Sequence, residues 1–232
     1  MKIYVAGGKN NVKSKFITGI REYACVDECI LDNKVYCELA VLHKIWKSSN
    51  EDIVGLEHYR RFFANPYKLS NTSKQYVLNE STIHDILDYS DVILTSNPIK
   101  KDLLTYKYTE PHNPLIVSGP KIKDALRDWD NFLKKDGTLD MSKILSRQKK
   151  SYKYFSCNMV ICKKDVLDRY CEWLFPRLEL FAQTHKIPNR VYGYLSEYTM
   201  GEWMIENSYK IFDAPKIRFT KDLSKCDWTS SH

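Results

Sequence analysis

The most informative segment of the chain is Asp52-Ile53-Val54-Gly55-Leu56-Glu57-His58-Tyr59-Arg60-Arg61-Phe62-Phe63. The apolar run at residues 53–56 predicts a buried strand. This run ends in an acid, a histidine, a tyrosine and two arginines, a set that no solvated loop requires. In open α/β sheets, ligands bind just beyond the carboxyl ends of strands. The stretch therefore predicts a strand that delivers polar side chains to a binding site.

Arg60 and Arg61 are the most informative residues of this stretch. Guanidinium groups bind phosphate or carboxylate through paired, charge-assisted hydrogen bonds. The two arginines thus favour a site for an anionic ligand. The alternative interpretation is a surface strand end whose arginines pair with nearby acids.

Strands and helices alternate along the chain, which favours an α/β fold with a mixed, mostly parallel sheet flanked by helices. Residues 3–5, 53–56 and 92–94 are expected to be buried, neighbouring strands of one sheet. Further strands are expected at residues 154–162, 210–212 and 217–219. Helices are expected at residues 12–24, 36–47, 82–89 (capped by Ser81), 119–135, 140–150, 164–182 and 192–207.

Size and composition bound the class of protein. The chain has 232 residues, 43% hydrophobic and 28% charged, which fits a single domain with a proper core. No apolar run approaches the ~20 residues of a membrane span. The N-terminus lacks the apolar region and cleavage site of a signal peptide. We therefore expect a cytoplasmic protein without a transmembrane segment.

The charge and the cysteines narrow the partners. A net charge of +7 and a pI near 8.9 favour anionic partners such as nucleotide diphosphates, anionic membranes or nucleic acid. Seven cysteines do not form an even disulfide framework, and no second Cys/His pair completes a zinc site beside Cys25 and Cys29. Free thiols are the expectation.

Asp128-Trp129-Asp130 has an Asp-x-Asp spacing, which can bind a divalent metal where both carboxylates converge. Residues two apart on a helix point in different directions, so we interpret this copy as a solvated helix face. By contrast, residues 97–114 form a long, lysine- and tyrosine-rich loop, a candidate lid or acceptor platform.

Several blocks of the sequence carry a family resemblance. Residues 55–63 read Gly-Leu-x-His-Tyr-Arg-Arg-Phe-Phe, and a helix with Glu38-Leu39 and Ile45-Trp46-Lys47 precedes them. Asn158-Met159-Val160-Ile161 and Gly193-Tyr194-Leu195-Ser196-Glu197 follow. In this order the blocks resemble a bacterial glycosyltransferase family of capsule and lipopolysaccharide gene clusters, formerly a domain of unknown function. Gly7-Gly8-Lys9 departs from the family's His-Lys, and Tyr198 stands where the family has Arg.

The resemblance implies a GT-A-like nucleotide-diphosphosugar transferase fold in one domain, residues 1–232. Residues 1–96 would form the nucleotide-sugar-binding half, residues 97–221 the acceptor and catalytic half, and residues 222–232 a polar tail. The implied function is transfer of a hexosyl or pentosyl group from a nucleotide sugar to a hydroxyl of a surface-polysaccharide glycan.

Donor contacts are expected at both ends of the diphosphosugar. The Gly7-Gly8 turn can bring backbone amides to a phosphate, and Tyr59, Arg60 and Arg61 would hold the diphosphate. The resemblance places Asn158 beside the donor sugar, where an amide can bind hydroxyls; the alternative is a turn cap.

Glu197 and His58 are the candidate catalytic residues. Glu197 would act as a base or orient a sugar, or it is a helix-start acid stabilised by the helix dipole. His58 is otherwise a satisfied core histidine. Either Glu57 and His58 bind Mn²⁺ or Mg²⁺, or the two arginines replace the metal. We favour the arginines.

The acceptor is expected on the loop that holds Lys101, Tyr106, Tyr108 and His112. The positive charge keeps two alternatives open. One is a glycosyltransferase that modifies hydroxymethylated or already glycosylated bases in phage DNA. The other is a non-catalytic nucleic-acid-binding protein, which would not need an acid among the strand-end residues.

Overall fold

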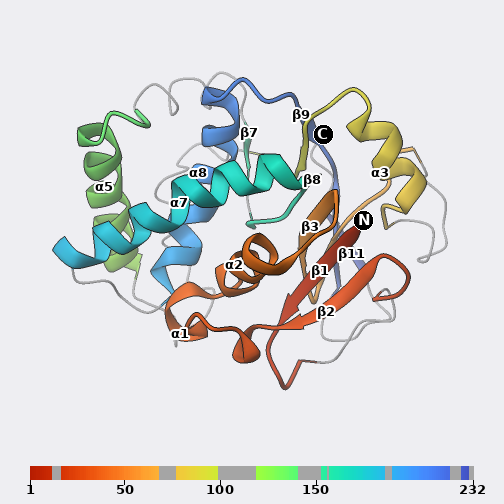
Figure 1. Ribbon diagram of the computed structural model, residues 1–232, viewed down its shortest axis with the longest axis horizontal. Coiled ribbons are helices and arrows are strands. Elements are labelled where there is room, and N and C mark those ends of the chain that lie inside the picture. The colour runs from red at the N-terminus through yellow and green to blue at the C-terminus, as the bar shows by residue number, and fades with distance from the viewer. Residues whose placement is uncertain are drawn as a thin grey trace.

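The structure, a computed structural model, describes residues 1–11, 17–67, 77–98, 119–140, 153–155, 157–185, 190–219 and 226–229. Eleven strands lie in this part of the chain: β1 (Lys2–Gly7), β2 (Arg21–Cys25), β3 (Ile53–His58), β4 (Arg61–Phe63), β5 (Val92–Leu94), β6 (Ser96–Pro98), β7 (Lys153–Phe155), β8 (Val160–Lys163), β9 (Ile211–Asp213), β10 (Lys216–Phe219) and β11 (Cys226–Thr229). The helices are α1 (Asn33–Tyr36), α2 (Leu39–Ser48), α3 (Glu80–Leu87), α5 (Gly119–Lys135), α7 (Lys164–Thr184) and α8 (Val191–Glu206) (Figure 1).

The main sheet is mixed, and the α/β class is confirmed. β3 lies at its centre, parallel to β1 on one side and antiparallel to β8 on the other. The expectation of a mostly parallel sheet is wrong. Only β1–β2, β1–β3 and β5–β9 are parallel pairs in the described sheet, whereas β3–β4, β3–β8, β4–β10, β5–β8 and β10–β11 are antiparallel. β8 also separates β5 from β3, so β5 is buried in the same sheet but is not a direct neighbour of β3.

Gly55 explains how closely β8 approaches the centre of the sheet. A Cβ atom at this position would lie 2.8 Å from Cγ1 of Ile161 and 3.1 Å from the carbonyl oxygen of Val160. Glycine alone lacks this atom. The glycine of the motif therefore serves the packing of β3 against β8.

The alternation of β3 and its neighbours divides the core between two faces of the sheet. Tyr4, Val54 and Leu56 pack with α2, α7 and α8 in the larger core cluster. Ile3 and Ile53 point the other way and pack with α3. Figure 1 shows α5, α7 and α8 on one side of the sheet and α3 on the other.

The chain order makes one edge of the sheet a natural ligand site. β1 lies between β2 and β3, and all three strands are parallel. After β1 the chain forms β2 on one side of it and later β3 on the other side. This arrangement is a topological switch point, and in α/β sheets ligands bind there, beyond the carboxyl ends of the strands. β8 runs antiparallel to β3, and Val160 pairs with Leu56. The turn at Cys157 and Asn158 therefore lies at the same edge.

Three expected elements near this edge need correction. The helix predicted over residues 12–24 is wrong at its end, because Arg21–Cys25 forms β2. The helix predicted over residues 36–47 is broken at Cys37, whose φ of 53° interrupts it between α1 and α2. Asn79, rather than Ser81, caps α3 by accepting a hydrogen bond from the Thr82 amide at 2.9 Å.

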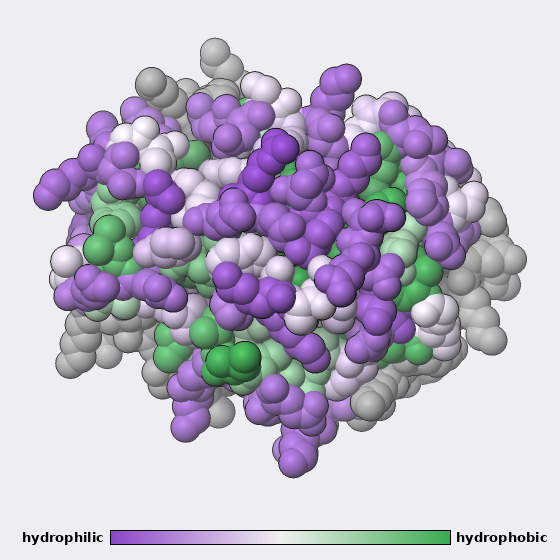
Figure 2. All heavy atoms as spheres, viewed as in Figure 1, coloured by the Kyte–Doolittle hydropathy of each residue, from purple (hydrophilic) through white to green (hydrophobic). Residues whose placement is uncertain are grey.

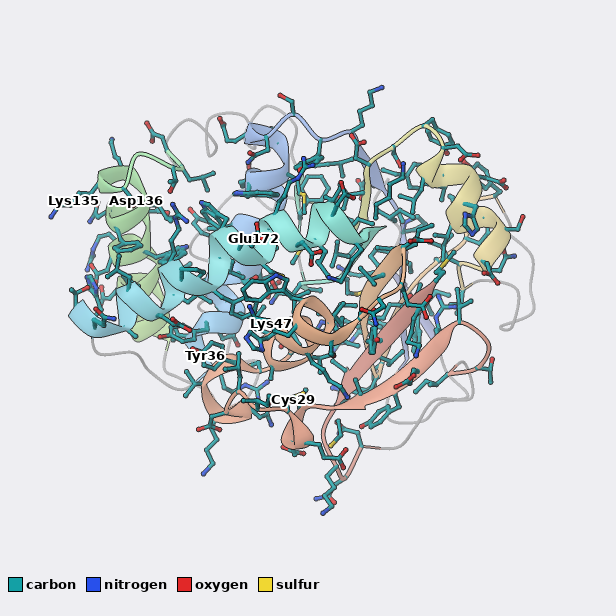
Figure 3. The ribbon with its side chains drawn as sticks, in the orientation of Figure 1. Cys29, Tyr36, Lys47, Lys135, Asp136 and Glu172 are labelled. Atoms are coloured by element: carbon teal, nitrogen blue, oxygen red, sulfur yellow. The ribbon has the colours of Figure 1, made fainter. Side chains whose placement is uncertain are left out.

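The long helices agree better with the sequence pattern. α5, α7 and α8 confirm the expected spans within a few residues, and α7 continues through Pro176 without a break. Asp136 lies just after α5 (Figure 3) and accepts a hydrogen bond from Nε of Arg177 on α7 at 2.8 Å. The outer face of these helices is mostly hydrophilic in Figure 2, with hydrophobic side chains in small separate areas. In the described part of the chain, no helix combines the length and apolar character needed to cross a membrane.

Two further predictions need correction, the first because a residue is buried and the second because a segment pairs in the main sheet. Asp128-Trp129-Asp130 lies on α5, but it is not a solvated face, because Trp129 is fully buried. Burial and the neighbouring Asp140 raise the pKa of Asp130 to about 7. The predicted polar tail contains β11, which pairs with β10 at the edge of the main sheet.

Candidate active site

Glu57 is closed off from any ligand by its own chain. It is fully buried and accepts hydrogen bonds from Arg21 Nε at 2.7 Å, Arg21 Nη2 at 3.1 Å and the Phe63 amide at 2.9 Å. These three bonds satisfy both carboxylate oxygens. Glu57 therefore ties β2 and β4 to β3, and its expected role as a metal ligand stays a prediction. The adjacent residue in sequence, His58, points into a different environment.

His58 ties β3 to the turn before β8. Its Nε2 lies within hydrogen-bonding distance of the carbonyl oxygen of Cys157. Because a carbonyl only accepts, Nε2 must carry the proton. Burial lowers the pKa of His58, and Arg61 lowers it further, while Glu38 and Glu197 oppose this effect. The imidazole is thus neutral at neutral pH, with its lone pair on Nδ1.

Tyr59 and Arg60 form the outer part of the β3–β4 turn. The Tyr59 amide donates to the carbonyl oxygen of Ala6 at 2.9 Å, which fixes the turn beside the end of β1. The Arg60 guanidinium lies 4.9 Å from the centre of the Tyr59 ring, a cation–π arrangement. Arg60 is therefore held at the same edge as the Gly7-Gly8 turn.

Arg61 is a cation that interacts electrostatically with the carboxylates of the site. Cys157 contributes most to the raised pKa of its guanidinium, and Glu197 and Glu38 raise it further against the effect of burial. The Arg61 side chain is partly exposed, and its guanidinium makes no hydrogen bond or ion pair to another described residue. A guanidinium in this state is suited to an anionic ligand.

Asn158 is almost completely buried, at 1% exposure, and has an unusual conformation. Its φ is 49° and that of Cys157 is 74°, so two consecutive residues adopt the left-handed region. This turn directs the Asn158 side chain toward α2 and α8, where Nδ2 donates to Oε1 of Glu38 at 2.8 Å and to the carbonyl oxygen of Gly193 at 2.8 Å. Its Oδ1 has no hydrogen-bond partner among the described residues.

Glu38 is a site residue that the sequence analysis missed. It precedes α2 directly, accepts from Asn158, and influences the pKa values of both His58 and Arg61. An acid just before the first apolar helix turn was visible in the sequence. Nothing in the sequence, however, showed that Asn158, 120 positions later, would lie against it.

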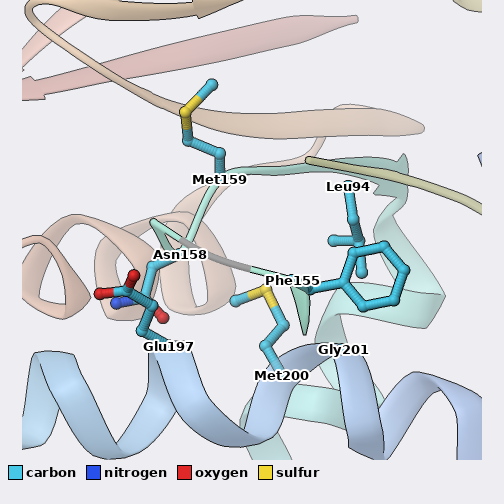
Figure 4. Close-up of a pocket in the computed structure, with 7 residues that line it drawn as sticks. All are labelled: Leu94, Phe155, Asn158, Met159, Glu197, Met200 and Gly201. Atoms are coloured by element: carbon cyan, nitrogen blue, oxygen red, sulfur yellow. The ribbon is translucent and has the colours of Figure 1, made fainter. Parts of the chain in front are cut away.

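Glu197 lies in the second turn of α8, not at the start of the helix, so the helix-dipole interpretation is wrong. It lines a small pocket together with Asn158 (Figure 4). In that view the two polar side chains reach toward the same place from α8 and from the β7–β8 turn. The remaining lining residues are Leu94, Phe155, Met159, Met200 and Gly201.

The Gly7-Gly8 turn lies at the carboxyl end of β1, as predicted. A Cβ on Gly7 would lie 2.5 Å from the Tyr23 hydroxyl, which donates to the Gly8 carbonyl oxygen at 2.7 Å. The Gly8 amide donates to Oδ1 of Asn11. A phosphate can therefore use the Gly8 amide only by displacing Asn11.

Another pair of residues that the sequence analysis missed borders the site. Lys216, on β10, is buried at 6% exposure, and its Nζ lies 3.7 Å from Sγ of Cys157. β10 pairs with β4 next to Arg61. Lys216 thus adds a second positive charge near Arg61.

The other predicted residues fall outside the described part. Lys101, Tyr106, Tyr108 and His112 lie in the gap between residues 98 and 119, and most of the basic segment at 140–150 lies in the gap between residues 140 and 153. Within the residues that the structure describes, no group of three or more His, Cys, Asp or Glu side chains is placed to hold a metal ion. The expected metal site at Glu57 and His58 therefore stays a prediction.

The fold and site define an α/β protein in which arginine, histidine, asparagine and glutamate side chains meet beyond the central strands. Residues 2–208 match the family model described as "Domain of unknown function (DUF4422)", and the chain belongs to this family. The apo structure of WbbM, a bifunctional glycosyltransferase, has a similar fold, with a TM-score of 0.62 over 93% of this chain and 18% sequence identity. This chain spans 44% of the WbbM chain. A comparison with curated proteins gives no match.

Proposed function

We propose that this protein is a glycosyltransferase that transfers a sugar from a nucleotide-sugar donor to a hydroxyl of a glycan acceptor. The fold shared with WbbM, a protein described as a glycosyltransferase, supports the reaction class. The GT-A type of that fold and the surface-polysaccharide acceptor remain inferences from the family resemblance.

Arg61 is the observation that carries this proposal. A departing nucleoside diphosphate develops negative charge, and fixed cations placed in advance stabilise such charge most effectively. Arg61 is a guanidinium without a described ion-pair partner at the carboxyl edge of β3, and Lys216 lies on the adjacent strand. Arg60 and Tyr59 extend the same edge toward β1.

Glu197 and Asn158 are assigned to the sugar side of the reaction. In the proposed step, the acceptor oxygen forms a bond to the anomeric carbon while the bond from that carbon to the diphosphate oxygen breaks. The acceptor proton passes to the Glu197 carboxylate, and the bonding electrons leave with the diphosphate near Arg61. His58 holds the Cys157 carbonyl and so keeps Asn158 in place; direct proton transfer by His58 stays a prediction.

The proposal assigns leaving-group stabilisation to the arginines and derives no step through a metal ion. The described donor set supports this choice, because Glu57 is bonded to Arg21 and His58 uses Nε2 on a carbonyl. The two alternatives, a glycosyltransferase that modifies phage DNA bases and a non-catalytic nucleic-acid-binding protein, depend on lysines outside the described residues. These alternatives and a cytoplasmic location therefore stay predictions from the sequence.

A thermal-shift screen tests the proposed function. The protein is heated with UDP-, GDP-, CMP- and dTDP-sugars, each with Mn²⁺ and with EDTA. We expect one nucleotide series to raise the Tm, equally in both conditions, and the same donor to be hydrolysed slowly without acceptor. Absence of both stabilisation and hydrolysis for every donor would contradict the proposed function. A shift that EDTA abolishes would contradict the arginine assignment alone.

A further inference from the structure

The small pocket between the β7–β8 turn and α8 has two unlike ends. Asn158 and Glu197 form a polar end, and Leu94, Phe155 and Met200 form an apolar wall (Figure 4). The pocket and Arg61 share a neighbour, because Glu197 lines the pocket and also contributes to the pKa of that guanidinium. It therefore lies next to the position proposed for the diphosphate.

The polar end accepts hydrogen bonds, and the orientation of the Asn158 amide proves this for one atom. Both hydrogens of Nδ2 point at acceptors, Oε1 of Glu38 and the carbonyl oxygen of Gly193. A flipped amide would place Oδ1 against these two oxygens, so the assignment is unambiguous. Oδ1 consequently faces the other way, buried and without a described partner. A buried acceptor of this kind destabilises the fold unless a ligand or water donates to it.

The charges around Oδ1 of Asn158 determine which ligand group can donate a hydrogen bond to it. Glu197 lines the pocket, and Glu38 lies directly behind Asn158. A hydroxyl group can donate to the Asn158 oxygen beside these carboxylates. A carboxylate on a ligand inside the pocket would instead face the Glu197 carboxylate, and like charges in contact weaken binding.

The size of the pocket limits what the hydroxyl can carry. It has room for about one water molecule. Its apolar wall is tightly packed, since a Cβ on Gly201 would lie only 2.3 Å from a ring carbon of Phe155. A single hydroxyl fits this space, whereas an acetamido group does not.

We propose that this pocket is the donor-sugar subsite for one ring hydroxyl and that it restricts the enzyme to neutral donor sugars without an N-acetyl group at that position. Asn158 accepts from the hydroxyl, Met200 closes the apolar side, and Glu197 and Glu38 exclude uronic acids. This inference rests on the proposed function.

Donor binding measured by isothermal titration tests the inference. The nucleotide that binds best among UDP, GDP, CDP and dTDP is used carrying glucose, galactose, N-acetylglucosamine, N-acetylgalactosamine or glucuronic acid. We expect an unsubstituted hexose to bind at least about tenfold more tightly than its N-acetylated or carboxylated counterpart. Equal affinity for an N-acetylated donor and its parent hexose would overturn the inference, although nucleotide binding would still support the proposed function. If none of the four nucleotides binds, both proposals fail.

A gain of specificity separates a subsite from a general structural effect. Met200→Ala enlarges the pocket, so we expect the affinity for the N-acetylated donor, relative to the parent hexose, to rise by about tenfold. Met204→Ala is the matched control, because Met204 is a fully buried methionine on the same helix that does not line the pocket. An equal rise in both variants, or no rise with Met200→Ala, would contradict the inference.

Discussion

Glu57 and Asn158 are both buried polar residues at the carboxyl end of β3, yet the structure treats them in opposite ways. Glu57 has every oxygen bonded to Arg21 or to a backbone amide. Asn158 has its amide hydrogens bonded and its oxygen left without a described partner. The first arrangement closes a joint between strands, and the second leaves an acceptor for a ligand. A polar residue at a strand end therefore does not by itself identify a binding site. A buried polar atom without a hydrogen-bond partner does.

Removing the Glu57 carboxylate has the largest expected effect on the stability of the protein. Glu57→Ala leaves Arg21 buried with no counter-charge, which should lower the free energy of unfolding by about 3–5 kcal/mol. Urea denaturation followed by circular dichroism measures this loss. A loss below about 1 kcal/mol would show that the buried Arg21–Glu57 pair contributes no more stability than a surface ion pair. It would then contradict the contrast between Glu57 and Asn158.

Truncating Asn158 should lower the free energy of unfolding by a smaller amount. Asn158→Ala removes two hydrogen bonds and leaves alanine at a φ of 49°, so we expect a loss of about 2 kcal/mol. Asn158→Gly is the matched variant, because it removes the same bonds but accepts the left-handed backbone. We expect Asn158→Gly to be more stable than Asn158→Ala, and both to lose discrimination among donor sugars in titrations. Wild-type discrimination in either variant would argue against a ligand role.

Asp130 is a partly buried acid without a described cation, and its pKa makes the stability of the protein depend on pH. Because its pKa is raised to about 7 in the folded protein, the protonated form stabilises the fold at low pH. This contribution is fully present below the unfolded pKa near 3.8 and is lost as the pH rises through about 7. Asp130→Asn mimics the protonated form. Its stability relative to wild type should rise between pH 4 and pH 7 and reach a gain on the order of 1–2 kcal/mol at pH 8 after allowance for solvent screening. A difference that is constant with pH would contradict the assignment.

The smallest effect is expected at the surface. Arg177 and Asp136 form an ion pair at 2.8 Å between α7 and the end of α5, with both side chains partly exposed. Asp136→Ala should change the free energy of unfolding by less than about 1 kcal/mol, and the change should shrink in 1 M salt. A loss as large as that of Glu57→Ala would mean that burial does not determine the strength of these pairs.

The same comparison explains what the sequence could predict. The apolar run before Glu57 and the periodicity of residues 164–182 and 192–207 indicated β3, α7 and α8, because local burial patterns determine such elements. The sheet order was not predictable in this way: β8 is inserted between β3 and β5 by contacts between distant segments. Arg21 illustrates this limit, since its partner Glu57 is 36 positions away and turns a predicted helix end into a buried strand.

The candidate site was predicted in part for the same physical reason. The structure brings together His58, Arg61, Asn158 and Glu197, which lie in three motif blocks. It adds Glu38 and Lys216, whose roles arise only from tertiary contacts. It also pairs Glu57 with Arg21, which the sequence did not show, because sequence reveals a carboxylate but not whether its lone pairs are already used.

Arg61→Ala, measured against Arg60→Ala, tests whether the Arg61 guanidinium stabilises the departing diphosphate. The measurement is the steady-state turnover of the nucleotide sugar that binds, with the urea midpoint of each variant as a control for folding. We predict that Arg61→Ala lowers kcat by about 10²–10³-fold with a stability change below about 1 kcal/mol, since the guanidinium has no described ion pair to lose. Arg60→Ala should lower kcat less. Unchanged turnover in a folded Arg61→Ala variant would contradict the account.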